Sequence, residues 1–419
     1  MAQTDRIGPE TKGSPWLQDG GHRAWLAGQA AGLVDFHRAS LGAGPGFHVL
    51  GTDGAPLPDR VQELHATTRM IHSYALAKLA GAPACDAIID RGMAYLFHHH
   101  RDPDHGGYVW ALEGDAVHDG RKLAYGHVFV LLAGASARLV GHPDADRLID
   151  DIAQVLDARF WEDGPGLFRD EWNRDWTPFS TYRGMNANMH GVEALLAAYE
   201  ATGEAVFLDR AGRILDFFTA RIAPDHGWRL PEHYTADWTV DPGYAGDPMF
   251  RPAGTTPGHS FELARLLLQY WDLAGRPDDG APDRARKLVG AALDAGWDDT
   301  RGGLVYTLGA DGRPAIRARY WWPLTEALGV LASLLKLDPT PADEDWYRRL
   351  WHFADAHFID HRHGGWFPEI DDDGAPAATQ FRGKPDIYHA LQALLLPLAP
   401  GLSRQATGIG PVLAPTAGG

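Results

Sequence analysis

Gly302-Gly303-Leu304-Val305-Tyr306, which runs on to a turn at Asp311-Gly312, is one of six versions of a motif that recurs along this sequence. In each version a glycine precedes aromatic and aliphatic residues. Several versions close with Asp-Gly, which is typical of a tight turn between two short strands. The marker glycines are Gly46, Gly107, Gly166, Gly227, Gly303 and Gly365. They are 61, 59, 61, 76 and 62 residues apart, which indicates an internal repeat with an insertion at 233–257.

Two kinds of helix alternate with these predicted hairpins. A helix with apolar residues at three- and four-residue spacing precedes most of them, for example at 206–222 and 285–297. A second helix, apolar or small nearly all round, follows each hairpin, and a helix without a polar face has to be buried. These buried helices are predicted at 69–79, 126–139, 189–199, 258–273, 322–335 and 388–396.

Six outer and six inner helices predict an all-α fold, an (α/α)6 barrel with short β-hairpins on one side. The alternative is a helical solenoid that serves as a binding scaffold, but solenoid repeats are usually shorter than these. We expect an N-terminal extension at residues 1–19, a single barrel domain at 20–400 and a flexible C-terminal tail at 401–419, because the tail is rich in Gly, Pro, Ala and Thr.

Composition and net charge limit the classes of partner that the chain is expected to bind. The chain has 419 residues and a formal net charge of −17, which opposes binding to the phosphates of nucleic acid. The single cysteine, Cys85, cannot form an internal disulfide, and no apolar run suggests a signal peptide or a membrane span. We therefore expect a cytoplasmic protein with no membrane partner. Monomer and homodimer both stay open.

A histidine lies near the predicted start of five inner helices. These residues are His72, His127, His190, His259 and His389, and Pro323 holds the place in the remaining helix. An acidic or amide residue follows three positions later in four helices, on the same helix face. These residues are Glu193, Glu262, Glu326 and Gln392. If the helix starts converge on one rim, they form a polar pocket. His72 and His127, which lack such a partner, are expected to play supporting roles.

Aromatic side chains accompany these polar groups. They are Tyr125, Tyr182, Tyr320, Trp321, Trp322 and Tyr388. Flat rings beside hydrogen-bonding groups suit a free sugar, whose C–H faces stack while its hydroxyls need partners. The sequence has no phosphate-binding loop, HExxH motif, CxxC pair or GxSxG elbow, and the histidine-rich run 98–105 lies away from the predicted helix starts. Neither a cofactor nor a metal is expected.

Six ordered blocks make the chain similar to the N-acylglucosamine 2-epimerase superfamily, and within it to the branch of mannose and sulfoquinovose isomerases. The blocks are Thr68-Arg69-Met70-Ile71-His72, Tyr125-Gly126-His127, Asn186-Ala187-Asn188-Met189-His190, Pro257-Gly258-His259-Ser260-Phe261-Glu262, Trp322-Pro323-Leu324-Thr325-Glu326-Ala327 and Lys384-Pro385-Asp386-Ile387-Tyr388-His389. The resemblance spans nearly the whole chain. It implies an (α/α)6 barrel and metal-independent chemistry at C2 of a sugar.

The resemblance also implies roles for single residues. His259 is expected to be the base that moves the C2 proton, and His389 the second catalytic histidine. The expected sugar-binding partners from the resemblance are Arg69, Asn186, His190 and Glu262. Further substrate-binding residues, assigned from their places near the helix starts, are Tyr125, Trp321, Trp322 and Glu326. Which of the two tryptophans faces the sugar stays open.

The expected reaction converts D-mannose to D-fructose by ring opening and a cis-enediol or enediolate intermediate. Imidazole titrates near neutrality and therefore suits these proton transfers. If the proton returns to the other face of C2 instead of to C1, the product is an epimer, so a 2-epimerase of the mannose/glucose or cellobiose type is the first alternative. A glycoside hydrolase with paired carboxylates, and a non-catalytic sugar-binding protein, are the remaining alternatives.

Overall fold

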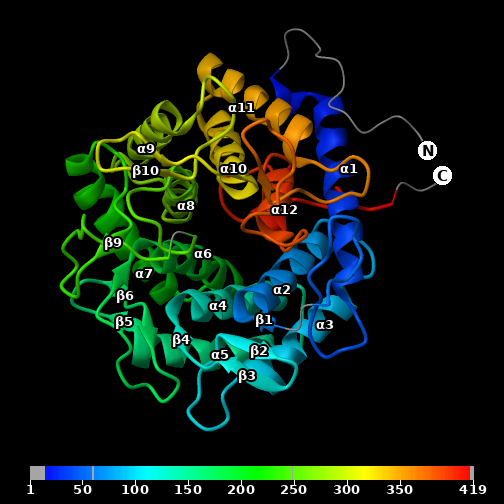
Figure 1. Ribbon diagram of the computed structural model, residues 1–419, viewed down its shortest axis with the longest axis vertical. Helices are drawn as coiled ribbons and strands as arrows, with labels where there is room; N and C mark the ends of the chain where they lie inside the picture. The colour runs from blue at the N-terminus through cyan, green and yellow to red at the C-terminus, as the bar shows by residue number, and fades with distance from the viewer. Residues whose placement is uncertain (1–14, 59–60, 248, 416–419) are drawn as a thin grey trace.

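The computed structural model describes residues 15–58, 61–247 and 249–415. In that part of the chain, six inner helices surround the centre and six outer helices surround them (Figure 1). The inner helices are α2 (Leu64–Leu79), α4 (Ala124–Leu139), α6 (Met185–Thr202), α8 (Pro257–Leu273), α10 (Trp321–Leu337) and α12 (Tyr388–Leu395). The outer helices are α1 (Gly20–His37), α3 (Asp86–Tyr95), α5 (Ala145–Val155), α7 (Ala205–Leu215), α9 (Ala281–Gly296) and α11 (Pro341–Phe353). The predicted (α/α)6 barrel is confirmed.

The difference between the two rings follows from the sequence pattern. Helix α10 is buried from Trp321 through Leu335, as expected for a helix with neighbours on every side. Helix α5 buries only the face that carries Leu148, Ile149 and Ile152 and leaves the opposite face to solvent. Burial of these apolar faces in one continuous core holds the rings together.

Helix α2 begins earlier than the pattern predicts, at Leu64 instead of residue 69. Its first turns contain His65, Thr67 and Thr68, polar and β-branched residues with modest helix propensity, and tertiary packing overrides that preference. As a consequence His72 lies about two turns inside α2. Its predicted place in the N-terminal turn is therefore wrong.

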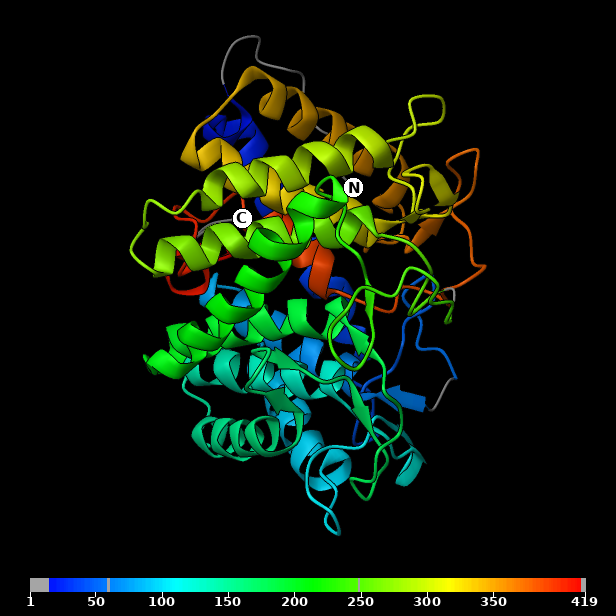
Figure 2. The same cartoon turned by 90° about the vertical axis from the view of Figure 1, so that its left-hand side faces the viewer.

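Short strands join neighbouring repeats at one end of the barrel. They are β1 (Val61–Glu63), β2 (Ala111–Glu113), β3 (Ala116–Asp119), β4 (Lys122–Leu123), β5 (Trp161–Glu162), β6 (Leu167–Phe168), β7 (Glu171–Trp172), β8 (Arg183–Gly184), β9 (His233–Tyr234), β10 (Thr307–Leu308), β11 (Pro314–Ile316), β12 (Arg319–Tyr320) and β13 (Glu369–Ile370). Hairpins form within repeats, as β2–β3, β5–β6 and β10–β11 show. Figure 2 shows the strands and long loops on one side of the molecule, as the sequence predicts.

A second set of strand pairs links each repeat to the next. The strand before an inner helix pairs antiparallel with a strand of the following repeat in β1–β2, β4–β7, β8–β9 and β12–β13. Single bridges between Thr255 and Leu308 and between Leu50 and Lys384 complete this pattern. The last bridge joins the sixth repeat to the first and closes the ring.

Buried ion pairs recur beside these strands. A cation just before an inner helix pairs with an acid that follows the preceding outer helix. The pairs and their N–O distances are Lys122–Asp102 at 3.1 Å, Arg183–Glu162 at 3.0 Å, Arg319–Asp298 at 3.0 Å and Lys384–Asp360 at 2.6 Å. In the first of these, both side chains are fully buried. The pairs fix the base of each hairpin against the barrel.

The chain ends differ from the expectation of loose extensions. In the predicted tail, Leu402, Ile409 and Leu413 are buried, and the backbone N–H of Leu413 donates to the carbonyl of Ala80 at 2.7 Å. Residues 401–415 of the expected tail pack on the barrel, because these apolar side chains cover the end opposite the strands; residues 416–419 lie outside the described residues. Flexibility of the tail stays a prediction. Of the expected extension, residues 1–14 also lie outside them, and Trp16 is buried. No helix within the described ranges is long and apolar enough to cross a membrane.

Candidate active site

His259 lies at the start of α8, where Thr256 is the N-cap residue and Pro257 the first helical residue. Its Nδ1 is 2.9 Å and 3.0 Å from the two carboxylate oxygens of Glu232. A carboxylate only accepts hydrogen bonds, so Nδ1 carries the hydrogen and Nε2 carries a lone pair. This is the tautomer that a proton-accepting imidazole needs.

His389 is held in the same way at the start of α12. Its Nδ1 is 2.8 Å from Oε1 of Glu326, which projects from α10. The other oxygen of Glu326 accepts a hydrogen bond from Arg265 at 3.1 Å. Two histidines from different repeats therefore share one arrangement, with Nδ1 bonded to a carboxylate and Nε2 available for chemistry.

Trp322 lies next to both histidines. Its indole ring lies 5.0 Å from the His259 imidazole and 6.0 Å from the His389 imidazole, measured between ring centroids. Trp321 is 6.2 Å from His389 and packs edge-on against Phe381. Trp322 is thus the tryptophan that lies near both histidines. Which of the two tryptophans faces the sugar stays open.

Arg69 lies between two aromatic rings, with its guanidinium 4.7 Å from the Phe129 ring and 4.6 Å from the Tyr388 ring. It donates to Asp386 at 2.7 Å and to the Tyr125 hydroxyl at 3.0 Å. Burial raises the pKa of Asp386, but the charges of Arg69 and His389 and the backbone N–H of Tyr388 together outweigh burial, so the pKa is lowered. Arg69 is consequently a fixed positive charge in a rigid aromatic setting.

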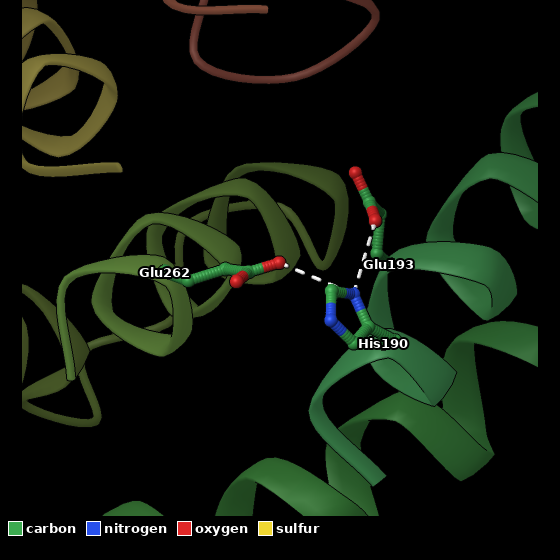
Figure 3. A group of neighbouring side chains, drawn as sticks. All are labelled: His190, Glu193 and Glu262. Carbon is green, nitrogen blue, oxygen red and sulfur yellow. Dashed lines mark ion pairs between the residues drawn. The ribbon is translucent and has the colours of Figure 1, made fainter. Parts of the chain in front are cut away.

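A buried group of His190, Glu193 and Glu262 lies next to these residues (Figure 3). Nδ1 of His190 is 3.3 Å from Glu262 and 3.7 Å from Glu193. Burial lowers the pKa of His190 to about 4, although Glu193 opposes the shift, so the ring is neutral at neutral pH. Burial, with Glu326 and Glu193 nearby, raises the pKa of Glu262 well above its usual range.

The three residues of this group offer ligand atoms within 4.8 Å of one another, and their types would suit a transition metal. However, the Arg265 guanidinium is 4.0 Å from both Glu193 and Glu262 and 3.1 Å from Glu326. A protein cation therefore already faces all three carboxyl groups. That the protein needs no metal stays a prediction.

The predicted site residues form a connected set, and Asn186 is the exception. Tyr125 links Arg69 to His190, at 5.2 Å between rings, and Glu326 links His389 to Arg265. Asn186 is half-buried in the first turn of α6, and its Oδ1 has no hydrogen-bond partner among the described residues.

The two histidines expected to play supporting roles have structural partners. His127 bonds the carbonyl of Leu123 through Nδ1 and accepts the backbone N–H of Tyr108 at Nε2. His72 bonds Ser136. These contacts are with the barrel wall and fit the expected supporting roles.

Glu232 and Asp386 had no assigned role in the sequence. Glu232 directly precedes β9 and is not at a helix start, and its carbonyl accepts the N–H of Met185, the first residue of α6. Carbonyls of Trp110, Asp170 and Pro368 accept the first N–H of α2, α4 and α10 in the same way. Because these residues follow their marker glycines at different distances, simple spacing hides their equivalence.

Comparison with known proteins places this barrel in a family. A family model described as N-acylglucosamine 2-epimerase (GlcNAc 2-epimerase) matches residues 46–393. A D-mannose isomerase from Thermobifida fusca is 42% identical over 404 residues, covering 94% of this chain and 99% of the relative. A crystal structure of D-mannose isomerase has a TM-score of 0.83 at 31% identity, covering 89% of this chain and 97% of that one.

A cellobiose 2-epimerase from Spirochaeta thermophila shares the fold, with a TM-score of 0.80 at 23% identity over 93% of this chain and 98% of that one. The barrel thus belongs to a known class of architecture. The chain belongs to the N-acylglucosamine 2-epimerase family. The resemblance seen in the sequence is confirmed.

Proposed function

We propose that this protein is an aldose–ketose isomerase that converts D-mannose to D-fructose. The observation that carries the proposal is the pair His259 and His389, each bonded at Nδ1 to a carboxylate and both next to Trp322. The identity of 42% to a D-mannose isomerase over almost the whole chain supports the choice of sugar.

The reaction divides into proton transfers at oxygen and at carbon. His389 protonates the ring oxygen and accepts the proton of the anomeric hydroxyl, which opens the ring. His259 then removes the proton from C2 through Nε2, and the electron pair moves to form the enediol or enediolate. Return of that proton to C1, while His389 takes the O2 proton and delivers it to O1, gives the ketose and restores both histidines. Proton transfer by a positioned imidazole suits each step at neutral pH.

The surrounding residues would bind and stabilise the sugar. Arg69 keeps its charge at any relevant pH and would offset negative charge on the enediolate. The indole face of Trp322 would stack on the sugar ring. Glu262, whose pKa is raised by burial, would bind a sugar hydroxyl.

The same residues would also serve a 2-epimerase, in which the proton returns to the opposite face of C2. A glycoside hydrolase fits less well, because Glu193, Glu262 and Glu326 are gathered around Arg265 and do not flank an open site. As part of the proposal, the partner is a free sugar and the compartment is the cytoplasm, in keeping with the single, buried Cys85.

Carbon NMR of D-mannose incubated with the purified protein in D2O tests the proposal. Fructose as the product supports it, whereas glucose as the sole product would establish the epimerase instead. The same sample reports exchange of the C2 proton with solvent. His259→Ala should abolish both product and exchange, and retained exchange would remove His259 from the role of base.

A further inference from the structure

Glu232 differs from every other carboxylate near the site in how it approaches a histidine. Both of its oxygens face Nδ1 of His259, at 2.9 Å and 3.0 Å. The side chain is 4% exposed, so water competes little for these bonds. His389 has a carboxylate partner too, but Glu326 directs its second oxygen to Arg265.

Two anchors fix the position of Glu232. Its backbone carbonyl accepts the N–H of Met185, and β8 pairs with β9 directly beside it. Its Oε1 accepts the backbone N–H of Thr256, the N-cap residue of α8, at 3.2 Å. The carboxylate therefore lies at the N-terminus of the helix that carries His259, where the helix dipole favours a negative charge.

These contacts link the insertion to the histidine. Residues 233–255 leave the barrel directly after Glu232 and return directly before Thr256, so the Glu232–Thr256 bond closes the base of this loop. Arg251 of the loop pairs with Glu171 at 2.9 Å, and His233 bonds the carbonyl of Pro252 at 2.7 Å. The loop is thereby held against the neighbouring repeat, and Glu232 with it.

We propose that Glu232 is the positioning residue of His259. It keeps the hydrogen on Nδ1 and the lone pair on Nε2, and its negative charge faces the imidazolium that forms when Nε2 takes the C2 proton. This inference rests on the proposed role of His259 as the base. Glu232 itself does not touch the sugar in this scheme and acts only through His259.

Glu232→Gln is the sharpest variant, because it changes the chemistry with almost no change in size. The backbone N–H of Thr256 requires an acceptor, which places the new amide oxygen at the Oε1 position. The amide NH2 then takes the Oε2 position, 2.9 Å from Nδ1 of His259, where it can donate only to a ring nitrogen without hydrogen. The amide oxygen at the Oε1 position, 3.0 Å from Nδ1, can still accept a hydrogen there. The variant therefore weakens the preference for the tautomer with the lone pair on Nε2, and it removes the negative charge that faces the imidazolium.

We expect Glu232→Gln to lower kcat by at least about 100-fold with KM changed less than about threefold, as for other histidines that lose an orienting carboxylate. With mannose deuterated at C2, the isotope effect on kcat should rise, because proton removal becomes slower than the other steps. Glu232→Asp, which keeps the charge, should recover part of kcat.

Glu200→Gln is the matched control. Glu200, unlike the buried Glu232, is half-buried; it lies on α6 at the far end of the barrel, where it bonds Gln269. Its variant should keep the wild-type kcat and isotope effect. If Glu232→Gln is folded by circular dichroism and keeps the wild-type kcat, the inference is wrong. It is also wrong if kcat falls while the isotope effect stays the same, or if Glu232→Asp is no better than Glu232→Gln.

The wild type separates this inference from the proposed function. If the wild type converts another aldose but not mannose, the proposed substrate is wrong, and Glu232 is tested with that aldose by the same measurements. If His259→Ala retains C2 exchange, the base is a different residue and the inference about Glu232 fails with it. If the wild type converts mannose but the Glu232 variants keep the wild-type kcat and isotope effect, the proposed function is supported and the positioning role of Glu232 is wrong.

Discussion

At the scale of single residues, the site depends on hydrogen-bonded pairs of histidine and glutamate that lie far apart in the sequence. The helix-start pattern predicted a set of histidines that includes His259 and His389, and the family resemblance implied that these two are catalytic. Neither predicted that Glu232 bonds the first, because an acid just before a two-residue strand resembles many acids near turns. For the second histidine, Glu326 was found as a site residue but its partner was not. Helix periodicity identifies which residues share a face, whereas these bonds connect different repeats.

Asp170 provides a test of electrostatics at this scale. It is the equivalent of Glu232 in an earlier repeat, and its Oδ2 accepts the N–H of Gly184 at 2.7 Å. Burial raises the pKa of Asp170 to about 7, although the Arg251 guanidinium opposes the rise. The folded state therefore holds this proton to a higher pH than the unfolded state. Its contribution to stability is full below about pH 4 and is lost as the pH rises through about 7.

Asp170→Asn removes this titration and keeps an acceptor for Gly184. Between pH 5 and pH 7, the free energy of unfolding of the wild type should fall by about 2 kcal/mol relative to that of the variant. Urea unfolding at the two pH values measures the difference, and the comparison cancels the titration of other groups. An equal difference between wild type and variant at both pH values would contradict the assigned pKa.

At the scale of elements, the repeat predicted both kinds of helix and the side on which the strands lie. It did not predict that strands pair between repeats, because two-residue strands such as β4 and β7 carry no pattern of their own. The buried ion pairs beside them were also missed. A lysine near a turn is usually exposed, and only the fold shows that Lys122 and Lys384 are buried.

Lys384 tests the importance of these pairs. Lys384→Met should lower the free energy of unfolding by about 3 to 5 kcal/mol, because it leaves the carboxylate of Asp360, which is 6% exposed, without its cation. The matched control is Lys78→Met. Lys78 pairs with Asp86 at the same distance of 2.6 Å, but both side chains are exposed, so the loss should be below about 1 kcal/mol. Equal losses in urea unfolding would show that burial does not decide the effect.

At the scale of the whole molecule, the barrel could be predicted from six repeats of similar length. The packing of the C-terminal segment could not be predicted, because its Gly-, Pro- and Ala-rich composition conceals three apolar residues, Leu402, Ile409 and Leu413, that cover the end of the barrel. Composition describes an average, whereas docking depends on a few side chains.

Metal dependence is a property of the whole enzyme. Arg69 and Arg265 supply fixed positive charge at the site, and paired imidazoles can move the protons, so a Lewis acid has no necessary step. Exhaustive dialysis against EDTA should therefore change kcat less than about twofold. A loss of activity restored by Zn²⁺ or Mn²⁺, with one metal per chain by elemental analysis, would instead assign the metal to His190, Glu193 and Glu262.

The bridge between Leu50 and Lys384 has a consequence for how the molecule unfolds. An open array of repeats can fray from its ends, because a terminal unit has only one neighbour. In this closed ring the first and last repeats support each other, so neither can detach without breaking contacts on both sides. The closed topology therefore favours cooperative unfolding. The histidines contributed by distant repeats stay together until the ring of repeats opens.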